Sequence, residues 1–275
     1  MQDTTPPITF SAAQRTAAEF LGSAFLLAAV VGSGIMGAKL ASGNTAIALL
    51  ANSIATGAIL FVLITIFGPV SGAHFNPAVT LVMMLKKNIN AASAAAYVVA
   101  QLAGAIAGVL AAHAMFDLPL MQISATARTG SSQWIAEALA TFGLIMTILG
   151  TVKFAPERVA AAVGLYILSA YWFTASTSFA NPAVTIARAL TDTFAGIAPA
   201  DVALFILAQL TGALAGYGIG QSLFGNRANY ADAHCVRRPR NAMHLSSSDA
   251  AIHSFGVCAW AMSPGPHTID GAPPL

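Results

Sequence analysis

Six apolar stretches, each long enough to cross a lipid bilayer, constrain the fold of this chain more than any other feature. They lie at about 16–38, 45–67, 91–113, 132–152, 159–175 and 202–224. A helix needs roughly 20 apolar residues to span the hydrocarbon core of a membrane. Charged residues make up 8% of the chain, against about 25% in an ordinary soluble domain, so the surface is suited to lipid. The alternation of about ten residues that membrane β-barrels require is absent from the sequence, and we therefore predict an all-α membrane protein.

The distribution of lysine and arginine predicts how these six spans are oriented. An even number of crossings places both termini, 1–15 and 225–275, on the same side of the membrane. Nine basic residues fall on that side, and two, Lys39 and Arg128, fall on the other. Because cytoplasmic loops carry the excess of basic residues, we predict a multi-pass protein of the inner (plasma) membrane with both termini in the cytoplasm. The net charge of +2 gives no reason to expect a nucleic-acid partner.

Three sequence motifs recur in the same order in the two halves of the chain. AEFLGSAFLL is similar to AEALATFGLI, NPAVT occurs twice, and QLAGAIAGVLAA is similar to QLTGALAGYGIG, at offsets of 118, 105 and 108 residues. Each half has three crossings, and an odd number means that the second half enters the membrane from the opposite face. We therefore predict inverted repeats at 16–113 and 132–224, joined by an extracellular connection at 114–131.

Each NPA motif begins an apolar piece that is too short to span the membrane alone. The two pieces run over about 76–86 and 181–191. Asparagine is a good N-cap and proline is favoured at the first helical position, so each motif marks the start of a helix. Inversion brings both starts to the bilayer centre, where their positive dipole ends face a path lined by loop carbonyls. A neutral molecule can exchange hydrogen bonds with such a wall, whereas a cation meets an electrostatic barrier.

These motifs together resemble the aquaporin and glycerol-facilitator (major intrinsic protein) family over about residues 10–224. The resemblance implies six transmembrane helices with two re-entrant half-helices, and a homotetramer with one pore in each subunit. Aquaporin-type pores exclude protons through an arginine or through the dipoles of half-helices. The stretch YWFTASTSFANPAVT is similar to bacterial aquaglyceroporin-like members associated with arsenic resistance. The pore motifs implied by the resemblance are Asn76, Pro77, Ala78, Asn181, Pro182 and Ala183.

One position departs from the pattern of that family. Val184 directly follows the second NPA, where most members carry an arginine that lines the narrow filter near the extracellular mouth. Valine has neither the permanent charge nor the several donors of arginine. The resulting filter is predicted to be wide, less polar and uncharged. The resemblance places the other filter residues at Thr56, Ser178 and either Ser169, from a gap-free count, or Tyr171, from an alignment of GLYIL.

Four ionisable side chains in the apolar stretches have both a structural and a functional interpretation. Glu19 and Glu137 occupy matching positions, which favours carboxylates that accept hydrogen bonds from the re-entrant loop of each half over a role in proton coupling. His74 lines the inner side of the pore according to the resemblance, or packs as a core residue. Arg188, one helical turn after Val184, is expected to point into a protein crevice or to the head groups rather than into the outer vestibule.

The function that these features favour is a passive channel for small neutral solutes together with water. Glycerol and undissociated metalloid acids, As(OH)3 or Sb(OH)3, fit a wide uncharged filter. A water-selective aquaporin and a proton-coupled secondary transporter are the alternatives. We expect no enzyme activity, cofactor or metal, because the spans contain no catalytic, zinc-ligand or phosphate-loop pattern. Cys235 and Cys258 lie in the 225–275 tail, which we predict to be disordered, at a spacing that matches no compact metal site.

Overall fold

The computed structural model describes residues 9–225 and arranges them as helices and connecting loops, without a β-strand in this range. The tail with Cys235 and Cys258 lies outside the described residues, as does most of the predicted N-terminal segment. The helices, in chain order, are α1 (Ala12–Leu40), α2 (Thr45–Ser71), α3 (Pro77–Leu85), α4 (Ala91–Met115), α5 (Ser131–Phe154), α6 (Val159–Phe173), α7 (Pro182–Arg188) and α8 (Pro199–Phe224), with a 3-10 turn, η1 (Pro156–Arg158), before α6.

The fold class predicted from the sequence is confirmed, with one difference in length. Within residues 9–225, five helices are long and apolar enough to cross a membrane: α1, α2, α4, α5 and α8. The sixth predicted span corresponds to α6, which has only 15 residues and begins directly after the 3-10 turn. An α-helix of that length is about 22 Å long, which is less than the roughly 30 Å of a hydrocarbon core.

Asparagine side chains start four of the helices. Asn44 and Asn90 cap α2 and α4, and Asn76 and Asn181 cap the short helices α3 and α7, each by accepting hydrogen bonds from backbone N–H groups of the first turn. Proline occupies the first turn of both short helices, where its missing N–H leaves no hydrogen bond unmade. The predicted starts of the half-helices therefore correspond to the observed ones.

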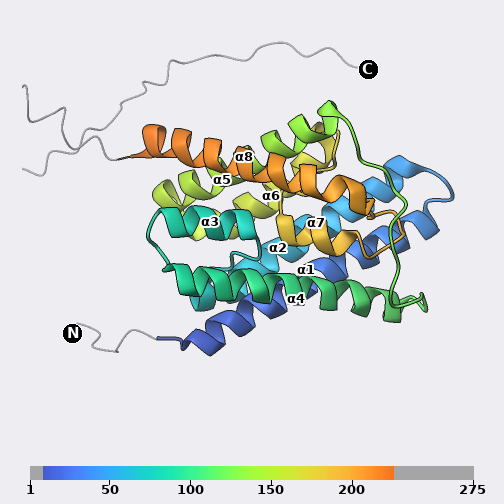
Figure 1. The fold of residues 1–275 in the computed structure, drawn as a ribbon, viewed down its shortest axis with the longest axis horizontal. Helices are drawn as coiled ribbons and strands as arrows, with labels where there is room; N and C mark the ends of the chain where they lie inside the picture. The colour runs from blue at the N-terminus through green and yellow to red at the C-terminus, as the bar shows by residue number, and fades with distance from the viewer. Residues whose placement is uncertain (1–8, 226–275) are drawn as a thin grey trace, which may run out of the picture. The chain divides into compact units, whose positions relative to one another are not determined.

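The helices pack in two sets with the same internal arrangement. In the first set α1 contacts α4 and α2, and in the second α5 contacts α8 and α6. The two sets meet where α2 packs on α6 and where each short helix contacts the long helix of the other half, α3 with α8 and α7 with α4. In Figure 1, α3 and α7 lie between the α1–α4 pair and the α5–α8 pair.

Glycines permit close backbone contacts between helices, and two of them, Gly104 and Gly212, occupy equivalent positions in the two halves. A Cβ atom at Gly104 would lie 2.2 Å from the carbonyl oxygen of Phe20, and one at Gly212 would lie 2.1 Å from that of Ala138. No side chain fits at such distances, so α4 packs on α1, and α8 on α5, backbone against backbone. The small-residue pattern around Gly104 and Gly212 is therefore explained by helix packing.

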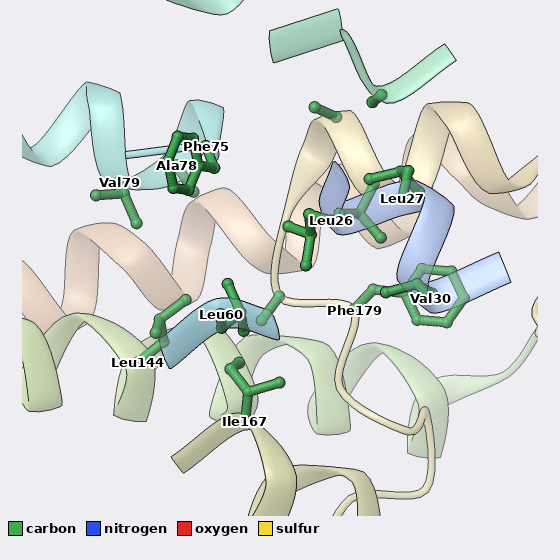
Figure 2. Packing of buried hydrophobic residues seen from close by; sticks show 14 of the residues in the cluster. Leu26, Leu27, Val30, Leu60, Phe75, Ala78, Val79, Leu144, Ile167 and Phe179 are labelled. Atoms are coloured by element: carbon green, nitrogen blue, oxygen red, sulfur yellow. The ribbon is translucent and has the colours of Figure 1, made fainter. Parts of the chain in front are cut away.

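The apolar core lies between the two sets of helices and surrounds the two re-entrant loops. Figure 2 shows Leu26 and Leu60, from α1 and α2, close to Leu144 and Ile167, from α5 and α6. The same four side chains line a cavity that runs through the centre of the helix bundle. The core is thus also the apolar part of the wall of the candidate site.

Candidate functional site

The candidate site is a cavity of about 440 Å³ that both short helices line. Its lining includes Lys86 at the end of α3, the two asparagines Asn76 and Asn181, and Arg188 at the end of α7. Because α3 and α7 begin near each other and point away from each other, the cavity extends from the end of one helix to the end of the other. A continuous space of this kind can hold a file of small molecules rather than one enclosed ligand.

The two asparagines connect the halves of the molecule at the centre of the cavity. Nδ2 of Asn76 donates a hydrogen bond to the carbonyl oxygen of Ala180 (2.7 Å), and Nδ2 of Asn181 donates to that of Phe75 (2.8 Å). Their Oδ1 atoms accept from the first turn of their own helices. An amide group has two N–H donors, so each asparagine keeps one for a molecule in the cavity.

Glu19 holds the loop that leads into α3. Its Oε1 accepts hydrogen bonds from the hydroxyl of Ser71 (2.6 Å) and the backbone N–H of His74 (2.9 Å). Its Oε2 accepts from the backbone N–H of Phe75 and the side-chain amide of Gln101, both at 2.7 Å. The carboxylate is fully buried, and these four donors satisfy it as an anion.

Glu137 holds the loop that leads into α7 in nearly the same way. Its two carboxylate oxygens accept from the backbone N–H groups of Phe179 (2.8 Å) and Ala180 (2.9 Å). Gln209 completes the set with a hydrogen bond of 2.6 Å. In each half the same glutamine also donates to the threonine of NPAVT: Gln101 to Thr80 at 2.9 Å and Gln209 to Thr185 at 2.8 Å.

Both loops contain residues in the left-handed backbone region at matching places. The residue just before each asparagine has positive φ, 46° at Phe75 and 50° at Ala180, and so has the residue two further back, 49° at Ala73 and 51° at Ser178. Residues other than glycine adopt this conformation at a cost of roughly 1–2 kcal/mol each. The hydrogen bonds to the glutamates and asparagines hold the loops in this conformation.

The short helices present equivalent residues to the cavity. On α3 the lining residues after Asn76 are Val79 and Met83, and on α7 those after Asn181 are Val184 and Arg188. These positions are spaced by three and four residues, so they share one face of each helix. Val184, the residue that replaces the usual arginine, thus faces the cavity, as Val79 does in the other half.

The other predicted filter positions also lie on the cavity. Thr56, Ser178 and Tyr171 line it, and the hydroxyls of Thr56 and Tyr171 are 3.2 Å apart, within hydrogen-bonding distance. Ser169, the alternative to Tyr171, is exposed on the outer surface of α6 and does not line the cavity. Of the two candidates, Tyr171 is therefore the one that lines the cavity.

Arg188 is buried, and it lines the cavity although the sequence-based expectation pointed it away from the vestibule. Its side chain is buried, Nε donates to the carbonyl oxygen of Ala195, and the guanidinium stacks on Phe179 with Cζ 3.4 Å from the ring centroid. It occupies a crevice, as expected, but it also lines the cavity. The reason is that α7 ends at Arg188, so the arginine continues the cavity-facing row of Asn181 and Val184.

Arg128, to which the sequence assigned no role, lies beside the same ring. Its Cζ is 4.9 Å from the centroid of Phe179, Nε donates to Gly196 (2.8 Å) and Nη1 donates to Ser176 (3.2 Å). Burial lowers the pKa of the Arg128 guanidinium, while the nearby Glu137 and Tyr171 act in the opposite sense. The connection at 114–131 was predicted to be extracellular, where few basic residues are expected. A basic residue there was the one feature of the sequence that could have pointed to Arg128.

His74 lies at the inner part of the cavity, on the side of α3. Its Nδ1 is 3.1 Å from the hydroxyl of Thr80, and its ring packs edge to face on Tyr97 at 5.4 Å. Tyr97 in turn donates to the carbonyl oxygen of Ser71 (2.9 Å). His74 is half-buried and lines the cavity, so both of its sequence-based interpretations, as a pore-lining and as a packed residue, describe it in part.

Comparisons with known proteins agree with this architecture. The family model described as Major intrinsic protein matches residues 8–155. The aquaglyceroporin AqpS of Rhizobium meliloti (strain 1021) is 57% identical over 205 residues, which cover 74% of this chain and 88% of the relative. Glycerol uptake facilitator protein-like 6 of Lactiplantibacillus plantarum is 34% identical over 213 residues, covering 72% and 92% of the two chains. The X-ray structure of the aquaglyceroporin from Plasmodium falciparum is similar with a TM-score of 0.58 and 20% identity, over 78% of this chain and 96% of that one, and shares the fold.

Proposed function

Because the chain belongs to the major intrinsic protein family and is therefore a membrane channel rather than an enzyme, we propose that it conducts small neutral hydroxylated solutes together with water. The substrate class that we propose is glycerol or undissociated metalloid acids, As(OH)3 and Sb(OH)3. The names of two relatives, an aquaglyceroporin and a glycerol uptake facilitator protein, support a polyol. The metalloid acids are supported by their similar size, neutrality and hydroxyl groups.

The observation that carries this proposal is the valine at 184. Its side chain lines the cavity, as do those of Thr56, Tyr171 and Ser178, and it is smaller than the arginine that most family members carry there. The wall around it combines apolar atoms with the hydroxyls of Thr56 and Tyr171. A polyol presents carbon on one side and oxygen on the other, and such a mixed wall suits both. Water alone would need no apolar surface.

Flux measurements in proteoliposomes test this proposal. We expect glycerol influx well above that of empty vesicles, and a Val184→Arg variant that loses about tenfold in glycerol flux while water flux falls less. Val184→Met, which adds bulk without charge, should reduce glycerol flux by a smaller factor than Val184→Arg. High water flux with glycerol influx no faster than in empty vesicles would favour the water-selective alternative.

A proton-coupled transporter is the second alternative. The hydrogen bonds of the two buried carboxylates, Glu19 and Glu137, argue against this function. Glu19 and Glu137 accept hydrogen bonds from loop N–H groups and glutamines, so protonation of either would break contacts that hold the loops. A passive channel therefore predicts solute flux that does not respond to an imposed pH gradient. Flux that doubles or more when the gradient is applied would support coupling instead.

We also propose that the channel is a homotetramer of the plasma membrane with both termini in the cytoplasm. An apolar groove between α1 and α4, lined by Phe20, Leu21 and Val99 among others, supports contact with a second subunit. Native mass spectrometry of the detergent-solubilised protein measures the subunit number. Orientation is testable through the two cysteines, Cys235 and Cys258, because a membrane-impermeant maleimide should label them only after intact cells are permeabilised.

A further inference from the structure

The end of the cavity on the α7 side carries a positive charge, Arg188, whose Nη donors have no hydrogen-bond partner in the described part of the chain. Arg188 is 2% exposed, and its Nε donates to Ala195. Within residues 9–225, the bond from Nε is the one hydrogen bond that the Arg188 side chain donates, and the side chain lines the cavity. Buried donors are almost always satisfied. The remaining donors of Arg188 are therefore available to whatever occupies the cavity.

Aromatic stacking holds this guanidinium, and no carboxylate neutralises it. Phe179 lies between two guanidinium groups, at 3.4 Å from Arg188 and 4.9 Å from Arg128. In the described part of the chain, no carboxylate oxygen lies within 4.0 Å of either group, where it would form an ion pair. The carboxylates of Glu137 and Asp201 accept hydrogen bonds from backbone N–H groups instead. The charge of Arg188 is thus directed at the cavity.

The other end of the cavity differs in this respect. Met83 occupies on α3 the place that Arg188 occupies on α7, and it is uncharged. The basic residues at that end, Arg15 and Lys86, are exposed and half-buried, so water and salt screen them. A buried charge is screened far less than an exposed one. Arg188 therefore gives the strongest electrostatic barrier among the basic residues that line the cavity.

We propose that this channel separates selection by charge from selection by size: Val184 sets the width of the mouth, and Arg188, one turn further along α7, rejects cations and protons. Arg128 acts as a positioning residue that fixes Phe179 and, through it, the guanidinium of Arg188. The proposal rests on the proposed function of the Val184 region as the constriction. If the two roles belong to different residues, mutation should change selection by size and selection by charge independently.

Parallel measurements of proton and glycerol flux in the same proteoliposomes test this separation. A pH-sensitive dye inside the vesicles reports proton entry under a potassium diffusion potential, and light scattering reports glycerol entry. We expect wild-type proton entry near that of empty vesicles, and an Arg188→Gln variant whose ratio of proton to glycerol flux rises about tenfold. Arg188→Lys should keep the wild-type ratio, since it keeps the charge. Arg158→Gln removes an exposed arginine that does not line the cavity and serves as the matched control with an unchanged ratio.

The double variant Val184→Arg with Arg188→Gln moves the charge back by one turn. It should restore the low proton entry while losing glycerol flux about tenfold, which a merely structural role of Arg188 would not produce. An Arg188→Gln channel that conducts glycerol and has wild-type proton entry would overturn the proposal. A wild-type channel that conducts protons well above empty vesicles would overturn it as well.

Two further outcomes of these flux measurements also test the role of Arg188. If Arg188→Gln does not reconstitute, Arg128→Gln takes its place, because that side chain is only half-buried and its loss should raise the ratio about threefold. A wild-type ratio in Arg128→Gln would then count against the arginine pair. If the wild type conducts water but not glycerol, the proposed substrate class fails, and the ratio of proton to water flux decides the role of Arg188 separately.

Discussion

The two re-entrant loops share one backbone arrangement but present different side chains to the cavity. In each loop a buried glutamate accepts from the two N–H groups before the asparagine, and a serine caps the residue two further on, Ser71 for Ala73 and Ser176 for Ser178. In the first loop the next cavity-lining residue is His74, packed on Tyr97 at 5.4 Å. In the second it is Phe179, packed on Phe205 at 5.3 Å.

This difference indicates which parts of the molecule build the pore and which parts select. The glutamates, glutamines, asparagines and threonines obey the internal symmetry, because both loops need the same hydrogen bonds to stay folded. At other equivalent positions the two halves carry different side chains. His74 in the first half corresponds to Phe179 in the second, and Met83 corresponds to Arg188. No shared hydrogen bond constrains these positions. Selectivity therefore lies where the two halves differ.

The largest expected effect comes from removing either buried glutamate. Glu19→Ala or Glu137→Ala leaves two buried loop N–H groups and a glutamine amide without an acceptor, which should lower the free energy of unfolding by about 4 kcal/mol. Glu19 also accepts from Ser71, so its loss should cost more than that of Glu137. Denaturant titration of the purified protein measures both. A glutamate whose removal changes nothing would end the symmetric interpretation of the loops.

Replacing the ring between the two arginines should have the next largest effect. Phe179→Leu removes the surface on which Arg188 and Arg128 stack and the edge contact with Phe205, for a loss of about 2 kcal/mol. The matched variant in the other half is His74→Leu, which loses only the contacts with Tyr97 and Thr80 and should cost about half as much. Equal losses in the same titration would contradict the proposed difference between the loops.

A stabilising change is expected where the loops are left-handed. Ala180→Gly and Ala73→Gly relieve a positive φ at buried positions without removing any polar contact of a side chain, and each should raise the free energy of unfolding by up to about 1 kcal/mol. Ala78→Gly, inside the first turn of α3, is the control and should destabilise by a similar amount. A loss of stability in both loop variants would show that the loops tolerate no added backbone freedom.

The smallest expected effect concerns the two hydroxyls that meet across the cavity. Tyr171→Phe removes the contact with Thr56 and should cost about 0.5 kcal/mol in stability. It also takes one polar atom from the wall, so glycerol flux should fall while water flux changes less. The same change at the half-buried Tyr217, which does not line the cavity, as Tyr217→Phe, provides the control for loss of a phenolic hydroxyl. A Tyr171→Phe channel with faster glycerol flux would indicate that the hydroxyl pair narrows the path rather than assisting the solute.

Much of this site could be predicted from the sequence, because its symmetric part is encoded locally. Asparagine followed by proline specifies a helix start whatever surrounds it, and a glutamate inside an apolar helix must find donors. The recurrence of these signals at a constant order then placed Glu19 with the first loop and Glu137 with the second. The half-helices and the cavity-facing position of Val184 followed from the same motifs.

The sequence by itself determined that the protein lies in a lipid bilayer, that its helices are duplicated, and which residues start and hold the re-entrant loops. Only the tertiary structure decided that Tyr171 rather than Ser169 faces the cavity, that Arg188 lines it, and that Arg128 reaches Phe179 from the connection between the two halves. The physical reason is that α6 is apolar on every side, so no periodic pattern marks its inner face. An arginine in a loop carries no periodicity at all, and its partners are separated from it by tens of residues, so only packing brings them together.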